Sequence, residues 1–443
     1  MEDILKLIED HQLLEARSRL VQMNVVDVAD FLENISREKS LIIFRILPKD
    51  FAADVFSYMS RKQQRYIVEN ITDNEIQLIL DQLLMDDTID FLEEMPANFV
   101  KKILASAEEN TRELLNQLLK YPKDSAGTLM TIEYVDLKKE MPVEQALKRV
   151  RNTNIDKETI DICYVTDSNR MLEGYLPLRR LILNDPHERI ENIMDRNVIF
   201  AHTLEDQEEV AAKFKRYDLF SMPVVDRENR LVGIITIDDI LDIIEEEATE
   251  DFQRMAAMEP SQEKYLDTSV FSLAKHRVLW LMLLMISATF TGNIVQQYQD
   301  VLQSVVLLAA FIPMLMDTGG NAGSQSSTLI IRGLALGEIT LKDTVQVMGK
   351  ECLVGILVGS ALALVNFLRL YYLEKVSFLI SFTVCVSILV TVLLAKVIGG
   401  ILPIIAKRLR LDPAMMAGPL ITTIVDAAAL LVYFSTATHF LNI

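Results

Sequence analysis

Five long apolar runs in the second half of the chain constrain its fold more than any other feature. They lie near residues 278–298, 301–331, 352–372, 378–405 and 414–439. Each approaches or exceeds the roughly 20 residues that a helix needs to cross the hydrocarbon of a bilayer. Lys and Arg gather at alternate flanks of these runs, which favours a cytoplasmic N-terminal part and an external C-terminus. The sequence therefore predicts a multi-pass membrane protein.

Charge is distributed unequally between the two halves. The residues before Lys275 include 33 basic and 55 acidic side chains, whereas those from Lys275 onward include 11 and 8. Such an acidic surface attracts cations and repels nucleic acid, so no nucleic-acid partner is expected. The first ten residues, MEDILKLIED, have no basic or apolar region of a signal peptide, so we expect the acidic half in the cytoplasm.

Catalytic and tight metal-binding motifs are missing from the sequence. The three cysteines, Cys163, Cys352 and Cys385, are scattered and are expected to be reduced. No H-E-x-x-H, Walker or EF-hand pattern is present, and no nucleophile is placed beside a base. The sequence thus predicts that the chain is not an enzyme and has no protein substrate.

The acidic half contains two architectures. Up to about Leu119, apolar residues recur every three or four positions, as in Leu41, Phe44 and Leu47, which is typical of short amphipathic helices. Beyond Tyr121 a pattern of strand, turn, strand and helix occurs twice. CYVTDSNRMLEGYLPLRRLI from Cys163 aligns with MPVVDRENRLVGIITIDDIL from Met222, and amphipathic helices at 143–151 and 205–215 precede the two copies. This part is an internal duplication.

One carboxylate, Asp426, lies inside the last apolar run. An ionised group at that depth costs at least a few kcal/mol, so it usually faces a partner, water or an ion. Thr422 and Gly418 lie four and eight residues earlier and would share its helix face. Doubled across a two-fold axis, Asp426 would favour a hydrated divalent cation such as Mg²⁺, which sheds its water reluctantly. Alternatively, Asp426 pairs with Lys396, the basic residue well inside another run.

The glycine-rich stretch GGNAG in the second run allows two interpretations. Irregular backbone near Gly319, Gly320 and Asn321, after Pro313, would turn carbonyl oxygens toward a water-filled pore. The same small residues would also allow close packing of helices. Asp317, just before the glycines, either adds negative potential at the inner mouth or caps a helix.

A dense acidic run from Asp238 to Asp251 leads toward the first span. Acids three and four residues apart on a helix repel each other by a few tenths of a kcal/mol per pair, roughly. A bound cation would relieve this repulsion, although a solvated acidic helix face is the alternative.

Two sets of motifs give the chain a family resemblance. The paired repeat, with MPVVD followed by GIITIDDI, resembles a CBS domain pair, a module that often binds adenosyl ligands between its halves. With GGNAGSQS at 319–326, DPA at 412–414 and PLITTIVD at 419–426, the chain resembles the MgtE family of magnesium transporters over nearly its whole length.

The resemblance implies a multidomain membrane protein with a helical N-terminal array, an α/β CBS pair and a five-helix transmembrane domain. The implied parts are an acidic N domain at 1–120, the CBS pair at 121–250, a connecting (plug) helix at 251–274 and the pore domain at 275–443. It also implies a homodimer in the plasma or inner membrane, in contact with the lipid bilayer.

The implied function is Mg²⁺ uptake through a channel that cytosolic Mg²⁺ closes by binding at acidic interfaces. Mg²⁺ is then both the transported and the regulatory ion. In the pore, the implied metal-binding residues are Asp426, Gly418 and Thr422. In the cytosolic domains and beyond, they are Asp86, Asp90, Asp206, Glu208, Asp218, Asp239, Asp242, Glu247, Glu250 and Asp251.

ATP as a ligand of the CBS pair is left open by the two repeats. Thr236 and Asp239 match the hydroxyl and the acid that CBS modules use toward a ribose, whereas the first repeat has Pro177 and Arg180 at the equivalent positions. A nucleotide site is therefore expected in one half at most.

Overall fold

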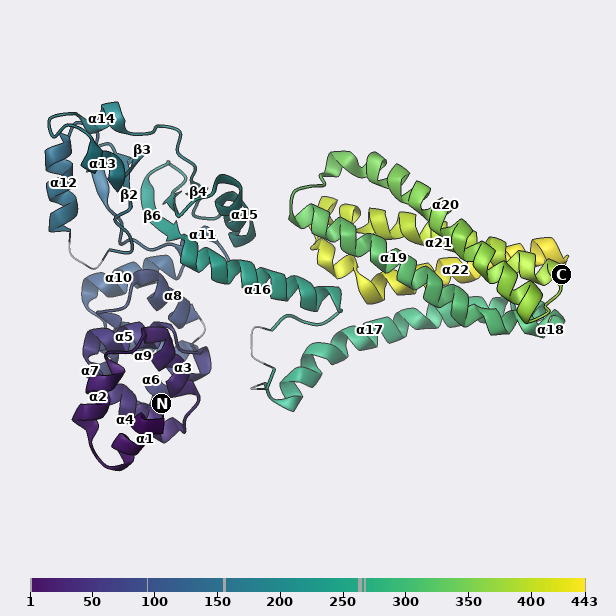
Figure 1. The fold of residues 1–443 in the computed structure, drawn as a ribbon, viewed down its shortest axis with the longest axis horizontal. Helices are drawn as coiled ribbons and strands as arrows, with labels where there is room; N and C mark the ends of the chain where they lie inside the picture. Colours follow the sequence, from purple (N-terminus) through teal and green to yellow (C-terminus); the bar gives the residue numbers. More distant parts are fainter. Residues whose placement is uncertain (1, 94, 154–156, 262–264, 267, 443) are drawn as a thin grey trace. The chain divides into compact units, whose positions relative to one another are not determined.

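Two compact units, Met1–Ile244 and Glu245–Ile443, make up the fold. The computed structural model describes residues 2–93, 95–153, 157–261, 265–266 and 268–442. Figure 1 shows the helices and strands of both units. The predicted fold class is confirmed: a helical array and a duplicated α/β region precede five long apolar helices.

The first unit begins with ten short helices (Figure 1). They are α1 (Glu2–Glu9), α2 (Leu13–Leu20), α3 (Val25–Glu33), α4 (Arg37–Ile46), α5 (Lys49–Ser57), α6 (Arg61–Asn70), α7 (Asp73–Leu80), α8 (Met85–Glu93), α9 (Ala97–Ser106) and α10 (Glu109–Leu118). Local signals start some of them: the Asn24 side chain caps α3, and Thr72 with Glu75 forms a capping box on α7. Phe44 and Leu47 are buried, and Leu41 is partly buried against the same core, which confirms the amphipathic pattern.

The duplicated region follows. Its first half contains α11 (Ala126–Leu129), β1 (Asp136–Lys138), α12 (Val143–Asn152), β2 (Ile162–Thr166), β3 (Leu172–Pro177), α13 (Leu178–Leu183) and α14 (Ile190–Ile193). Its second half contains β4 (Ala201–His202), α15 (Gln207–Tyr217), β5 (Ser221–Val225), β6 (Leu231–Thr236) and the start of α16 (Ile237–Met255). Each half forms one three-stranded sheet, in the order β1-β2-β3 or β4-β5-β6, with the first pair parallel and the second antiparallel.

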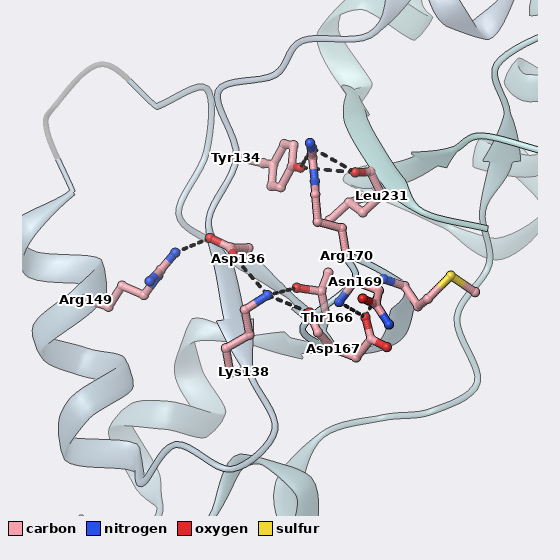
Figure 2. A network of polar contacts seen from close by, with 10 residues as sticks. Tyr134, Asp136, Lys138, Arg149, Thr166, Asp167, Asn169, Arg170 and Leu231 are labelled. Atoms are coloured by element: carbon pink, nitrogen blue, oxygen red, sulfur yellow. Dashed lines mark hydrogen bonds and ion pairs between the residues drawn. The ribbon is translucent and has the colours of Figure 1, made fainter. Parts of the chain in front are cut away.

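The two halves repeat each other down to individual hydrogen bonds. Asp167 Oδ1 accepts from the backbone N–H of Asn169 and of Met171, at 2.7 and 2.8 Å, in the turn between β2 and β3 (Figure 2). Asp226 Oδ1 accepts in the same way from Glu228 and Arg230, at 2.8 and 2.9 Å. These are Asx turns, which explains why an aspartate stands at this position in both copies.

Arg170 joins the two halves across their turns. Its Nη2 donates to the Tyr134 hydroxyl and to the Leu231 carbonyl oxygen, both at 3.1 Å (Figure 2). The backbone N–H of Leu231 donates to the Arg170 carbonyl oxygen at 2.9 Å. One core contains side chains of the N-terminal helices together with those of the second half, including Phe91 of α8 and Ile240 of α16. This core therefore includes residues of α8 and of the start of α16.

The described residues of the second unit include five helical segments that are long and apolar enough to cross a membrane: Val270–Gln297, Val306–Ala335, Leu341–Leu373, Phe378–Arg408 and Pro413–Leu441. They comprise α17 (Val270–Gln297), η1 (Val306–Phe311), α19 (Ile312–Ala335), η2 (Leu341–Asp343), α20 (Thr344–Leu368), η3 (Arg369–Leu373), α21 (Phe378–Arg408), η4 (Pro413–Met416) and α22 (Gly418–Leu441). A short helix, α18 (Gln299–Ser304), joins the first two segments.

The segment predicted as a connecting helix, 251–274, has a different structure. The helix that leaves β6, α16, begins at Ile237 and ends at Met255, and α17 begins at Val270. Positions 256–261, 265, 266, 268 and 269 between them are not helical, and 262–264 and 267 lie outside the described residues. The start of the predicted segment, up to Met255, thus belongs to the helix that follows β6, because the run from Ile237 has no glycine or proline to end it before Met255.

Glycines allow the membrane helices to approach each other closely. A Cβ on Gly399 of α21 would lie 2.2 Å from the Gly323 carbonyl oxygen of α19. A Cβ on Gly319 would lie 2.9 Å from the side chain of Thr391 in α21, and a Cβ on Gly320 would lie 2.9 Å from that of Thr422 in α22. Small residues are the usual means of helix packing in membranes.

Candidate functional site

Asp426 lies within α22, in the last of the five apolar segments. Its side chain is partly exposed on the surface of the isolated chain, whereas the preceding Val425 is buried against Gly319 and Gly323 of α19. Within the described residues, Asp426 has no ion pair, and the neighbour that acts on it electrostatically is the carboxylate of Asp317. Two acids from α19 and α22 therefore repel each other inside the membrane unit.

Lys396 does not neutralise Asp426. Its Nζ donates to Oε1 of Gln325 at 3.2 Å, and the residue is only 6% exposed. The alternative interpretation of Asp426 as half of an intramembrane ion pair with Lys396 is wrong.

Thr422 and Gly418 share α22 with Asp426, at the spacing that the sequence predicts. The Thr422 hydroxyl donates to the Pro419 carbonyl oxygen at 2.9 Å, and its methyl group packs against Gly320. Gly418 is the first residue of α22 and has a φ of +41°. A Cβ there would lie 2.7 Å from the carbonyl oxygen of Met255, the last residue of α16. Glycine at this position lets the end of α16 contact the start of α22.

The glycine-rich stretch is helical. Gly319, Gly320 and Asn321 all lie within α19, which runs without interruption from Ile312 to Ala335. Their carbonyl oxygens are therefore engaged in the helix, and the predicted irregular backbone is wrong. Gly319 and Gly320 face α21 and α22, so the packing interpretation is confirmed. Asp317 lies inside the same helix and is not its N-cap, which is Phe311.

An acidic cluster forms in the first unit between α8, α16 and the segment before β2. Asp86 is buried, and burial together with Asp239 raises the pKa of its carboxyl well above the ordinary value. Burial and Asp238 raise the pKa of Asp239 to about 7, and burial and Asp90 raise that of Asp87 to about 6. Burial and Asp238 also raise the pKa of Glu158 to about 7. Each shift reflects carboxylates held together with little water.

The other predicted ligands of the first unit lie apart from this cluster or have partners. Asp90 forms a 2.7 Å ion pair with Arg61. Asp206 caps α15 and accepts from the Glu208 backbone N–H at 2.9 Å, whereas Asp218 ends the same helix in a left-handed conformation. Asp206 and Asp218 stand at opposite ends of the 11-residue helix α15, about 18 Å apart at 1.5 Å per residue, so they cannot bind one ion together. Asp242 is exposed on α16.

A second acidic cluster lies at the end of α16 in the second unit. Arg254 forms ion pairs with Glu250, one turn earlier, and with Asp412, the residue that caps η4. Burial and Asp412 raise the pKa of the Asp251 carboxyl. Met255 packs against Ala414 and Ala417 at the start of the last segment. Glu250 and Asp251 are therefore near Asp412, and Glu247 lies one turn before them on α16.

No three His, Cys, Asp or Glu side chains among the described residues are arranged to hold a metal ion directly. A hydrated Mg²⁺ needs no such arrangement, because its waters make the contacts with the protein. The carboxylates of Asp86, Asp87, Glu158 and Asp239, which lie close together in the first unit, fit outer-shell binding of a hydrated cation.

Equivalent positions of the two repeats differ in chemistry. Thr236 ends β6 and its hydroxyl donates to Asp239 Oδ2 at 2.9 Å. Pro177 ends β3 at the corresponding ladder position, and Arg180 donates to the Ile193 carbonyl oxygen at 3.1 Å. Only the second repeat has the hydroxyl and acid side by side.

Five residues of these clusters are absent from the predicted ligand set: Asp87, Glu158, Asp238, Arg254 and Asp412. Glu158 is more than 60 residues from both Asp87 and Asp239 in the sequence, so no local pattern indicates their contact. Asp412 belongs to the DPA motif. An aspartate directly before the start of a helix is a capping signal, and this signal could have indicated Asp412 from the sequence.

Comparisons with known proteins agree with this arrangement. Residues 312–436 match the family MgtE, described as a divalent cation transporter; residues 23–124 match the MgtE intracellular N domain, and residues 190–246 a CBS domain. Magnesium transporter MgtE of Thermus thermophilus is 36% identical over 95% of this chain and 94% of its own length. Magnesium transporter MgtE of Bacillus subtilis is 33% identical over 99% of this chain and 97% of its own length.

Among solved structures, the cytosolic domain of the Mg²⁺ channel MgtE in complex with ATP is similar to the first part of the chain. It is 35% identical with a TM-score of 0.52, and the match covers 54% of this chain and 98% of that one. Similarity in sequence extends over nearly the whole chain, in the same domain order as the geometry described above. The chain therefore belongs to the MgtE family of divalent cation transporters.

Proposed function

We propose that the chain forms a Mg²⁺ channel for magnesium uptake that cytosolic Mg²⁺ closes. The observation on which the proposal depends is Asp426: an intramembrane carboxylate that is partly exposed, has no ion pair within the described residues, and faces the repulsion of Asp317. Acids in membrane segments usually face an ion path. The family and its relatives named as magnesium transporters support Mg²⁺ as the ion.

Charge provides the selectivity in this proposal. In a homodimer, two copies of Asp426 would face each other across the two-fold axis. At a separation of about 5 Å and an effective dielectric constant near 20, each carboxylate attracts a divalent ion by about 7 kcal/mol and a monovalent ion by about 3 kcal/mol. The ion keeps its water, because Mg²⁺ dehydrates reluctantly. The basic flanks of the spans support a cytoplasmic first unit and an external C-terminus.

Closure would use the acidic clusters. Asp86 lies on α8 and Asp239 at the start of α16, and burial together with neighbouring carboxylates raises the pKa of each. At the other end of α16, burial and Asp412 raise the pKa of Asp251, although Arg254 forms ion pairs with Asp412 and Glu250. Mg²⁺ bound at both ends would hold α16 in one position against the start of α22. Swinging a closed population from 1:99 to 99:1 takes about 5.5 kcal/mol, which several weak sites together can supply.

ATP binding at the second repeat is a further part of this proposal. The similar cytosolic domain was solved with ATP, and Thr236 with Asp239 gives this chain the matching hydroxyl and acid. Calorimetry with ATP on the parent and a Thr236→Val variant tests it, and equal heats from the two proteins would contradict it.

The pore proposal is tested by neutralising Asp426 alone. An Asp426→Asn variant should fail to rescue growth of cells that lack magnesium uptake, and Mg²⁺ flux into vesicles should fall at least about tenfold, the factor for about 1.4 kcal/mol of lost attraction. Asp300→Asn is the matched control, since Asp300 lies in α18 and outside the five apolar segments. Parent-like flux through Asp426→Asn would refute the proposal.

Closure is tested by electrophysiology. In a variant with Asp86→Asn and Asp239→Asn, millimolar cytosolic Mg²⁺ should no longer shut the current, whereas the Asp426-dependent current itself should persist. If internal Mg²⁺ still closes this variant as it closes the parent, the feedback mechanism is wrong.

A further inference from the structure

A cavity of about 510 Å³ opens in the membrane unit away from Asp426. Its walls come from α19, from the loop and η2 that follow it, and from α20 and α21. The volume falls within the range of about 300–1,000 Å³ that is usual for small-molecule sites. The proposed transport function does not use this cavity.

A buried cation contributes to its lining. Lys396 of α21 is 6% exposed, and its partner within the described residues is the neutral amide oxygen of Gln325. Lysines are almost never fully buried unless they are paired with an anion. An ammonium in this environment therefore favours an anionic group in the cavity beside it.

A carboxylate lines the same cavity and is not paired with that lysine. Glu351 of α20 accepts a 2.6 Å hydrogen bond from the Ser326 hydroxyl, and its side chain lies against Gly400 of α21. In the described part of the chain, neither Glu351 nor Lys396 takes part in an ion pair. The cavity thus presents one positive and one negative group, each bound to a neutral partner.

The remaining lining repeats this mixture of charges over an apolar wall. Lys350 adds a second ammonium, and Glu338 and Asp343 add carboxylates, of which Asp343 is engaged in a capping box with Thr340. The apolar part of the lining consists of Leu329, Ile330, Ile339, Val347 and Val354. A simple anion would be repelled by the carboxylates, and a simple cation by the lysines. A ligand with both charges fits.

Exposed apolar side chains indicate that the ligand has a hydrocarbon part. Leu329, which lines the cavity, is 62% exposed, and Leu353 and Leu357 of α20 are 66% and 72% exposed. These helices lie in segments long and apolar enough to cross the membrane, so acyl chains would cover such residues. A lipid has both parts, a charged headgroup for the cavity and acyl chains for the exposed apolar side chains.

We propose that the cavity binds the headgroup of a lipid of the phosphatidylethanolamine class. The phosphate accepts from Lys396 and Lys350, and the primary ammonium donates to Glu351 and Glu338. A choline headgroup has no N–H to donate, and a glycerol headgroup has no cation, so both bind less well. The bound headgroup joins α19, α20 and α21.

Native mass spectrometry of the full-length protein, exchanged into micelles with equal amounts of ethanolamine, choline and glycerol phospholipids, tests the proposal. The parent should retain the ethanolamine lipid about tenfold better than the other two, which is the effect of one charge-assisted hydrogen bond. Lys396→Met should lose that preference. Lys342→Gln is the matched control, because Lys342 is exposed on η2 and does not line the cavity.

A second variant keeps the test valid should Lys396→Met fail to fold. Glu351→Gln preserves the shape of the site and removes its carboxylate, so retention of the ethanolamine lipid should fall while retention of the glycerol lipid rises. Equal retention of ethanolamine and glycerol lipids by the parent would overturn the proposal, as would a parent-like preference in both variants. Displacement of the lipid by an equal concentration of O-phosphoethanolamine would show a soluble ligand instead and would likewise overturn it.

Discussion

Gly399→Ala should destabilise the membrane unit strongly, although it adds a single methyl group. The new Cβ would lie 2.2 Å from the Gly323 carbonyl oxygen, where van der Waals contact needs about 3.4 Å, so α19 and α21 would have to separate by about 1 Å. Overpacking of this kind costs roughly 1–3 kcal/mol. The contact is with backbone, so no side-chain rotation can relieve it.

Gly349→Ala provides the matched control, because a Cβ on Gly349 of α20 meets no atom within 4 Å. Glycine in a helix interior is roughly 0.5–1 kcal/mol less favourable than alanine, so this variant should be as stable as the parent or slightly more so. The two variants should thus differ by roughly 1.5–4 kcal/mol. In a unit of this size that corresponds to a difference in Tm of roughly 5–15 °C.

Thermal unfolding of both full-length variants in the same detergent measures this difference. Gly399→Ala should also lower Mg²⁺ flux, since α19 and α21 form the surface against which α22 and Asp426 are positioned. If Gly399→Ala and Gly349→Ala unfold at the same temperature, the close approach of α19 and α21 does not contribute to stability as argued here.

Three further predictions concern the acidic clusters and α22. Folding raises the pKa of Glu158 and Asp239 to about 7, so the folded state binds protons more strongly than the unfolded state. The free energy of unfolding should therefore decline as pH rises from about 4 to about 7. Calorimetry in the presence of a chelator should show this decline, and millimolar Mg²⁺ should reduce it. Arg254→Gln removes the ion pair with Asp412. In the absence of Mg²⁺, proteolysis between α16 and α17 should therefore be faster in this variant than in the parent, and an equal rate would show that the ion pair does not hold the end of α16. Gly418→Ala should reduce Mg²⁺-dependent closure in current recordings, because its φ of +41° and the nearby Met255 carbonyl oxygen both disfavour a Cβ; unchanged closure would argue against this contact.

Much of the candidate site depended on contacts between residues that are distant in sequence. The local sequence around Gly319 and Gly320 is compatible with a broken helix and with a tightly packed one. Their neighbours Thr391 and Thr422 come from other helices. Likewise, the choice of Asp426 or Gln325 as the partner of Lys396 depends on how α19, α21 and α22 rotate about their axes. Periodicity specifies a helix and its apolar face but not this rotation.

Features whose physical cause is local can be predicted from the amino-acid sequence alone. Apolar length predicts the five membrane segments, alternation and turn residues predict the duplicated strands, and the Asp167 and Asp226 turns follow from side chains that bond to their own backbone. The tertiary structure decided which charges meet: Glu158 with Asp239, and Arg254 with Asp412. Electrostatic repulsion and burial depend on distance in space, and only the packing of the whole chain sets those distances.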